Sequence, residues 1–482
     1  MTPIVLRDPL PRLGSLRRRG IKAILMVPLL ALALAGCATN PEKTDMLPEA
    51  QIISLPPLPA MKMFGAASPV APMVSNADLA EDFLDLSFQL ESGRDLPVMT
   101  RFEGPIRVQA KSAGGGALPA TLSRDLSALL IRMRNEAHLD IRMAREGETP
   151  NLIVQAVSGE DIRHELPDAA CFVVPGISDL SEFRTARYEA RTDWGRMTQR
   201  DLIALFVPAD AAPQELRDCL HEEMAQALGP LNDLYRLPDS TFNDDNLHPI
   251  LTGYDMLILR LTYARELHSG MTRAQVQAQL PALLARLNPA GQQIPPRHAR
   301  ATPRQWDAAV SRTLGPGASP AARLRSATDA VAIAEKEGWD DNRTAFSYYI
   351  LGRLTQPQDP ALARDLFLHA YQIYASDPVT GLQAAHVAAQ LAPYHLALGE
   401  PGSVLALLGS AETEARRHQD AALLAWIEML QAEALDLQGN GSRARSVRLD
   451  SLGWAGYGYA PDWVIWSKLQ SAAALSPLYI GD

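Results

Sequence analysis

The sequence predicts an α+β domain, with a mixed sheet and two long helices, followed by an all-α helical-repeat domain. Short apolar strands alternate with amphipathic helices in the first half of the chain. The alanine-rich second half repeats apolar residues at helical spacing, interrupted by short turns with Pro, Gly or Asp. With 482 residues, of which 47% are hydrophobic and 21% charged, the chain can form two or three globular domains.

The N-terminus has the pattern of a secretory leader. Five basic residues lie between Arg12 and Lys22, and an apolar run follows over residues 23–34. This run is shorter than the roughly 20 residues that cross a bilayer. Residues 1–36 are therefore predicted to be a signal peptide.

Small residues precede a cysteine at the end of this leader. The segment Leu34-Ala-Gly-Cys37 resembles the lipobox of bacterial lipoproteins, which implies that Cys37 is lipidated and anchors the chain to a membrane. An ordinary signal peptide with a chance cysteine is the alternative. By the same resemblance, Ala38 after the cysteine favours the periplasmic face of the outer membrane over the inner membrane.

The domain that follows has a recognisable order of elements. Residues 37–76 are rich in proline and are expected to form an extended tether, and the first domain is expected over residues 77–287. Its predicted elements are a strand at 102–109, a helix at 121–137, strands at 139–143, 152–157, 171–174 and 202–207, and a helix opened by Pro213. This order is similar to that in the N-terminal half of a zincin, a zinc-protease domain.

Two cysteines remain in the chain after Cys37. An exported protein folds in an oxidising compartment, so Cys171 and Cys219 can form a disulfide. Such a bond would connect the strand at 171–174 to the helix opened by Pro213. Two buried free thiols are the alternative.

The segment Cys219-Leu-His-Glu-Glu-Met-Ala-Gln-Ala-Leu-Gly-Pro-Leu-Asn232 resembles the metal-binding helix of zinc proteases. If His221 is the first ligand and Glu222 the base, the second ligand position falls on Ala225, which binds nothing. A second register places the three ligand positions on Glu222, Gln226 and Asn232, and the base on Glu223.

The second register keeps Gly229 where the helix must end, in the left-handed conformation common just past a helix. Two amide oxygens and one carboxylate are nevertheless a poor donor set for zinc, which prefers imidazole and thiolate. We therefore expect no zinc and no other cofactor at these residues. They could brace a buried helix, line a cleft that binds peptide without cleaving it, or hold an unusual metal for catalysis.

A wider set of motifs is similar to a proteobacterial family of exported domains, metzincin-like and of unknown function (domain of unknown function 2927). The shared pattern comprises Cys-x-x-Glu-Glu-x-x-Gln-x-Leu-Gly, then Phe-Asn-Asp-Asp, then Leu-Thr-x-x-Asp-x-x-x-Leu-Arg-x-x-Tyr, over roughly residues 102–287. The resemblance implies that Glu-Glu-x-x-Gln is a family pattern with a retained role in structure or ligand binding. The acidic loop at 239–246 is interpreted as a solvated turn, and His221, His248 and His268 lie in no ligand spacing.

The rest of the chain is predicted to be a linker over residues 288–320 and a helical domain over residues 321–482. Helices are expected at 345–354, 360–374, 381–398, 403–417 and 420–437. The sequence Leu351-Gly352, followed by Ala363, Phe367 and Ala370, resembles the tetratricopeptide repeat, in which small residues and an aromatic ring let paired helices approach. A generic helical bundle is the alternative.

These observations favour a cell-envelope lipoprotein that binds or scaffolds an unidentified envelope protein or peptide through a degenerate zinc-protease fold. One alternative is an active metallopeptidase with Glu223 as general base and a metal held by Glu222 and other groups. Another is a purely structural envelope protein. The net charge of -10, without a basic stripe after the leader, argues against nucleic acid as a partner.

Overall fold

The structure is a computed structural model that describes residues 57–68, 70–297 and 301–479. The predicted leader, Cys37 and the first part of the predicted tether lie outside the described residues. Within the described part of the chain, no helix combines the length and hydropathy needed to cross a bilayer.

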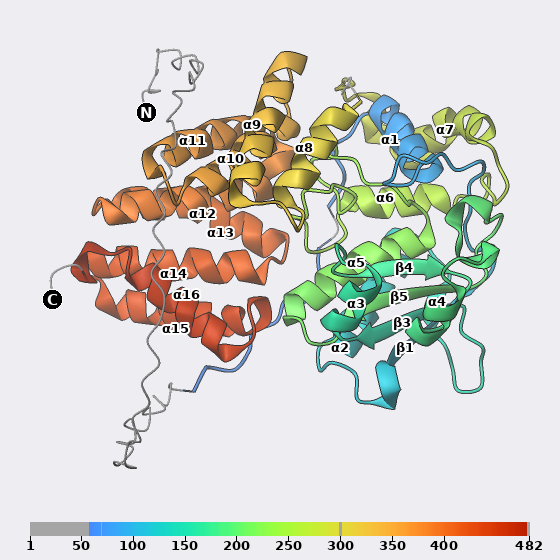
Figure 1. The fold of residues 1–482 in the computed structure, drawn as a ribbon, viewed down its shortest axis with the longest axis horizontal. Coiled ribbons are helices and arrows are strands. Elements are labelled where there is room, and N and C mark those ends of the chain that lie inside the picture. Colours follow the sequence, from blue (N-terminus) through green and yellow to red (C-terminus); the bar gives the residue numbers. More distant parts are fainter. Residues whose placement is uncertain (1–56, 69, 298–300, 480–482) are drawn as a thin grey trace, which may run out of the picture. The chain divides into compact units, whose positions relative to one another are not determined.

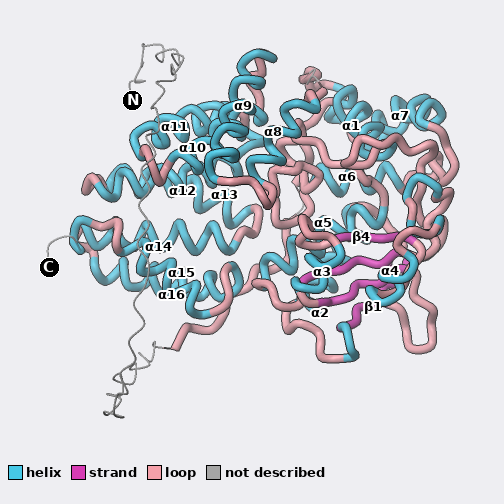
Figure 2. The backbone as a smooth tube through the Cα atoms, viewed as in Figure 1, coloured by secondary structure: helices cyan, strands magenta, loops and turns pink. Residues whose placement is uncertain are grey.

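A five-stranded sheet forms the centre of the first half of the described chain (Figures 1 and 2). Its strands, in sheet order, are β2 (Ile141–Met143), β1 (Ile106–Ser112), β3 (Leu152–Val157), β5 (Ile203–Pro208) and β4 (Phe172–Pro175). The first four are parallel, and β4 runs antiparallel to β5 at one edge. Every residue of β3 and β5 is buried, because both faces of the sheet are covered.

Alternate residues of the central strands enter two separate cores. Leu152 and Val154 pack into the larger core, whereas Ile153 packs into the smaller one, as the two-residue period of a strand requires. The larger core also includes residues of five helices: α1 (Asn76–Phe88), α2 (Leu122–Glu136), α5 (Pro213–Leu228), α6 (Gly253–Thr262) and α7 (Arg273–Leu287). The smaller core lies under the short helices α3 (Gly159–Glu165) and α4 (Leu180–Ala186).

The predicted mixed sheet and its order of main elements are therefore present. The strand expected from residue 102 begins only at Ile106, because Phe102 is buried in the larger core from the preceding loop. The two main sheet-packing helices, α2 and α5, lie within one or two residues of the limits expected from the sequence.

An all-helical region makes up the second half of the described chain (Figure 1). Its helices are α8 (Arg304–Leu314), α9 (Pro320–Glu337), α10 (Asn342–Thr355), α11 (Pro360–Ser376), α12 (Gly381–Ala397), α13 (Pro401–Arg417), α14 (Ala421–Leu437), α15 (Gly441–Gly458) and α16 (Asp462–Ala473). Each helix packs against the next one along the chain. The predicted all-α region is thus confirmed.

The prediction of a linker over residues 288–320 is wrong in its centre, where α8 lies. Trp306 of α8 is fully buried, and its indole Nε1 donates a hydrogen bond to Ser347 Oγ at 3.0 Å. The buried residues of α8 recur at helical spacing. They are too few to stand out among the surrounding prolines.

The two halves share a buried interface. Tyr235, from the first half, packs edge-on against Trp306 with ring centroids 4.9 Å apart. On α5, Gln214 Nε2 donates to Asp420 Oδ1 at 3.0 Å and Arg217 donates to the carbonyl of Gln419 at 2.6 Å. The first domain and the helical region are therefore parts of one compact unit.

The end of the predicted tether belongs to the same unit. The backbone N–H of Lys62 donates to the carbonyl of Gly453 at 2.8 Å, and Phe64 stacks on Trp454 with ring centroids 4.4 Å apart. Arg124 of α2 donates to the carbonyl of Phe64. These residues are not a free spacer, because Phe64 contacts the helical region through its ring and α2 through its backbone carbonyl.

Replacement of Gly352 by alanine tests the close helix pair in the helical region. A Cβ atom at Gly352 would lie 2.7 Å from the buried ring of Phe367, so Gly352→Ala overpacks the contact between α10 and α11. We expect the free energy of unfolding to fall by about 1 kcal/mol, since overpacking outweighs the gain in helix propensity.

The matched control is Gly409→Ala in the exposed part of α13, where an added Cβ meets no atom within 4 Å. It should stabilise the protein by about 0.5–1 kcal/mol. Denaturant titration of both variants measures the difference, and equal effects would contradict the packing argument.

Candidate functional site

Helix α5 directs three of its polar side chains into a cleft of about 790 Å³. Glu222, Glu223 and Gln226 lie one helical turn or less apart and form one wall. The segment that leads into β4, and the residues Phe172 and Val173 of β4 itself, form another wall. The cleft thus lies between a helix and the exposed edge of the sheet.

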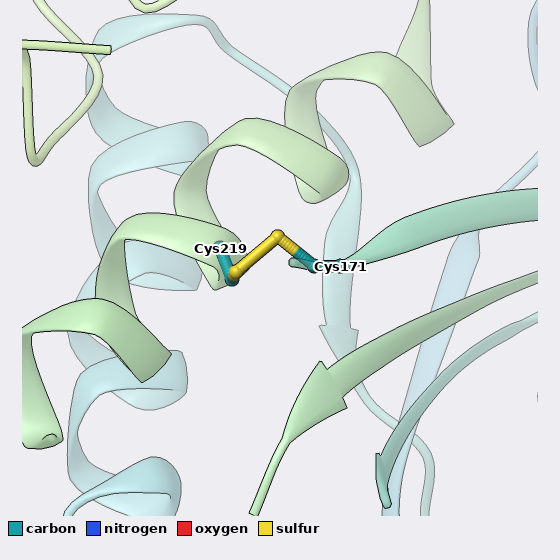
Figure 3. The surroundings of a disulfide bond; sticks show 2 residues. All are labelled: Cys171 and Cys219. Carbon is teal, nitrogen blue, oxygen red and sulfur yellow. A yellow bond between two sulfur atoms is a disulfide. The ribbon is translucent and has the colours of Figure 1, made fainter. Parts of the chain in front are cut away.

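The predicted disulfide joins these two walls. Cys171, just before β4, is bonded to Cys219 of α5 (Figure 3). Cys219 is buried in the larger core, three residues before Glu222. The bond therefore fixes the position of the carboxylate-bearing part of α5 relative to the edge strand.

Six carboxylic acids line the cleft: Glu91, Asp168, Glu222, Glu223, Asp233 and Asp244. Burial, together with the nearby charges of Glu91 and Asp244, raises the pKa of Glu222 to about 7. Burial and neighbouring carboxylates also raise the pKa of Glu91, Glu223 and Asp233, whereas burial alone accounts for the rise at Asp244. The lining residues of the cleft include no lysine or arginine.

Gln226 is the main neutral donor among these acids. Its Nε2 lies 3.3 Å from Glu91 Oε1 and 3.5 Å from Asp233 Oδ2. Two other acid oxygens, Glu223 Oε2 and Asp233 Oδ1, are buried and have no hydrogen-bond partner among the described residues. The Glu223 residue is only 5% exposed. The cleft therefore has unused acceptors for a ligand that donates hydrogen bonds or carries positive charge.

Neither zinc-protease register places all of its residues in the cleft. Glu222, Glu223 and Gln226 reach the cleft together, but Asn232 is buried beside α1, where its Nδ2 donates to the carbonyl of Asp85 at 3.1 Å. The next residue, Asp233, enters the cleft instead. In the first register, His221 points into the protein, and its Nδ1 accepts a hydrogen bond from the backbone N–H of Leu251 at 3.0 Å.

The expected conformation of Gly229 is wrong. It ends α5 as predicted, but its φ of -170° is extended rather than left-handed. Glycine is needed there for another reason, because a Cβ would lie 2.9 Å from Cγ2 of Thr262 on α6. The glycine lets the end of α5 approach α6 closely.

One further interpretation also differs from the structure. The loop at 239–246 is not a solvated turn, because Ser240, Asn243 and Asp245 are buried. His248, just after this loop, is buried as well. The helical region covers this loop, and no local sequence pattern could indicate that contact.

Four cleft acids were not predicted from the sequence: Glu91, Asp168, Asp233 and Asp244. Glu91 follows α1, more than a hundred residues before α5. Asp233 and Asp244 were noted only as parts of a motif or of an acidic loop. Only Asp233 and Asp244 lie in the acidic stretch that follows α5, and no local pattern connects Glu91 with that helix.

Comparison with known proteins covers the region that contains the cleft. Residues 76–282 match the model of a family described as protein of unknown function (DUF2927). No curated protein and no solved structure matches the chain. The predicted resemblance to this family of unknown function is thus confirmed for residues 76–282; the matched DUF2927 region begins at α1, earlier than expected, and ends within α7. It therefore includes all six cleft acids.

Replacing both disulfide cysteines by serine tests how strongly the bond holds the cleft walls. The bond closes a loop with a sequence separation of 48 residues, so Cys171→Ser with Cys219→Ser should lower the free energy of unfolding by about 4 kcal/mol in the chain-entropy model. Urea denaturation measures the loss. The wild-type chain in reductant should show a similar loss, and unchanged stability in both cases would contradict this role.

Replacing Glu222 by glutamine tests the electrostatics of the cleft. The pKa of Glu222 is raised in the folded protein, so its ionisation opposes folding increasingly as pH rises from the unfolded value near 4.5 to about 7. Since Glu222 is partly exposed, Glu222→Gln should stabilise the protein by about 1 kcal/mol more at about pH 8 than at about pH 5. Glu215→Gln, at an exposed position on the same helix, should show no such difference in denaturant titrations at the two pH values.

Proposed function

We propose that this chain is a cell-envelope lipoprotein whose acidic cleft binds an extended, positively charged peptide segment without cleaving it. The observation that carries the proposal is the group of six acids without a lysine or arginine, beside an open strand edge. In this proposal the DUF2927 region recognises the peptide, and the helical region supports the cleft and offers a second surface for an envelope partner.

The charge of the cleft favours a cationic ligand. Burial and mutual repulsion disfavour ionisation of Glu222, Glu223 and Asp233, so a lysine, an arginine or an amino terminus in the cleft would relieve the repulsion. Glu223 Oε2 and Asp233 Oδ1, which are buried without partners, offer acceptors for its N–H groups. Affinity for such a ligand should rise with pH as Glu222 ionises.

The strand edge favours an extended main chain. Strand β4 pairs with β5 alone, so its other edge has backbone groups available for an added strand. Phe172 and Val173 of this strand line the cleft opposite Glu222 and Glu223. A peptide on this edge would present alternate side chains to the acids of α5.

The donor chemistry argues for binding rather than catalysis. The residues in the zincin ligand register do not fit zinc, because they offer no imidazole or thiolate and Asn232 is turned toward Asp85. The amide nitrogen of Gln226 is directed at Glu91 and Asp233, so this side chain serves as a hydrogen-bond donor in the cleft. Without a metal, Glu223 has no bound water to activate as a general base.

The frame and the location of the protein are part of the same proposal. The order β1, α2, four further strands and α5 supports a degenerate metzincin-like frame, and the contact of Gly352 with Phe367 supports a tetratricopeptide-like helix pair. The disulfide fits an oxidising compartment. The predicted leader and Cys37 support a lipid anchor facing the periplasm, on the outer membrane rather than the inner one.

Fluorescence anisotropy with labelled decapeptides tests the proposal. The chain from residue 37, with Cys37→Ser, is titrated with a peptide of alternating lysine and valine and with its glutamate counterpart. The basic peptide should bind more tightly, with affinity that falls as salt rises, and Glu222→Gln or Glu223→Gln should weaken binding roughly tenfold. Glu215→Gln, exposed at the start of α5, is the matched control and should leave the affinity unchanged.

Each other outcome excludes this function. Equal binding of the acidic peptide, or variants without effect, would show that the cleft acids do not recognise the ligand. Cleavage of the basic peptide, detected by mass spectrometry, would establish the active peptidase instead. Binding of neither peptide under low-salt conditions would leave the purely structural role.

A further inference from the structure

A second group of polar side chains lies apart from the cleft, where the DUF2927 region meets the helical region. Asp239 and His248 come from the loop between α5 and α6, and His418 is the C-cap residue of α13. One possible ligand atom from each residue lies within 4.8 Å of those from the other two. Among the described residues, no other three His, Cys, Asp or Glu side chains meet this condition.

His248 is the residue in this group that lacks hydrogen bonds. It is only 8% exposed, and neither ring nitrogen has a hydrogen-bond partner in the described chain. Its Nε2 lies 3.6 Å from Asp239 Oδ1, beyond hydrogen-bond length. A buried imidazole with two unsatisfied nitrogens points to a missing ligand.

His418 completes the group from the opposite side of the interface. The rings of His418 and His248 lie edge to face, with an angle of 75° between their planes and 5.3 Å between their centroids. His418 Nε2 accepts a hydrogen bond from Arg417 at 3.2 Å, and Arg417 also forms an ion pair with Glu414 at 3.2 Å. Arg417 therefore keeps a partner if His418 turns to another ligand.

We propose that Asp239, His248 and His418 bind one zinc ion, which connects the DUF2927 region to the helical region. Two imidazole nitrogens and a carboxylate oxygen are a common zinc donor set, with water as the fourth ligand. Tetrahedral zinc at about 2 Å from each donor requires donors about 3.4 Å apart, so the separation of Asp239 from His248 already fits. The remaining adjustment needs only small side-chain rotations across the interface.

This zinc site differs from the zinc-protease register in both position and role. Glu222, Gln226 and Asn232, on and after α5, remain a poor donor set for zinc. The new site uses His418, which is separated from His248 by 170 positions, so no ligand spacing could reveal it. Its role is to hold two parts of the fold together, independently of what the cleft binds.

The test is zinc titration of the untagged full chain from residue 37, with Cys37→Ser, after dialysis against chelator. Calorimetry and elemental analysis should find one zinc ion per chain, and zinc should raise the melting temperature. His248→Ala and His418→Ala should each weaken zinc binding by roughly tenfold or more. If an alanine variant fails to fold, Asp239→Asn and His248→Gln replace it in the test, because they preserve side-chain shape better. Both should also weaken zinc binding.

His395→Ala is the matched control, because His395 is a partly exposed histidine of α12 that pairs with Glu400. It should bind zinc as the wild type does. Cobalt in place of zinc should give the visible absorption of a tetrahedral site in the wild type and in His395→Ala, but not in His418→Ala. Absence of stoichiometric zinc, or zinc binding that the three ligand variants leave unchanged, would overturn the proposal.

Discussion

The position of α5 determines the geometry of the cleft, because this helix is held on two sides. The disulfide from Cys219 fixes it to the segment before β4, and Arg217, two residues earlier, donates to the carbonyl of Gln419 between α13 and α14. Since neighbouring residues on a helix point about 100° apart, these anchors also fix the direction of Glu222 and Glu223. Both acids are thus kept in the cleft although burial opposes their charge.

Local sequence patterns were sufficient for the central strands and the main helices, because these patterns concern neighbours along the chain. The buried runs that became β3 and β5, the helix opened by Pro213 and the pairing of Cys171 with Cys219 could all be predicted. The contact of Gly352 with Phe367 was also present in the pattern of small and aromatic residues. Each of these features depends on periodicity or on one chemical property of a residue type.

The candidate site could be predicted only in part, because its other members meet through tertiary structure. Glu91 follows α1, and Asp244 lies in a loop beyond α5, so neither shares a periodic pattern with Glu222. Asn232 and Asp233 show the limit most clearly. The motif favoured Asn232 as a cleft residue. The chain turns after Gly229, however, so that Asn232 donates a hydrogen bond to the carbonyl of Asp85 and Asp233 enters the cleft.

The loop from Asp233 to His248 connects the cleft with the interface. Asp233 and Asp244 line the cleft, whereas Asp239 and His248 face His418 of the helical region. Between them, the backbone carbonyl of Tyr235 accepts from Asn342 and its ring packs on Trp306. Because the helical region holds this loop at several points, the positions of Asp233 and Asp244 depend on the packing at that interface. The helical region is therefore part of the cleft architecture, and any ligand that tightens the interface also restricts where Asp233 and Asp244 can lie.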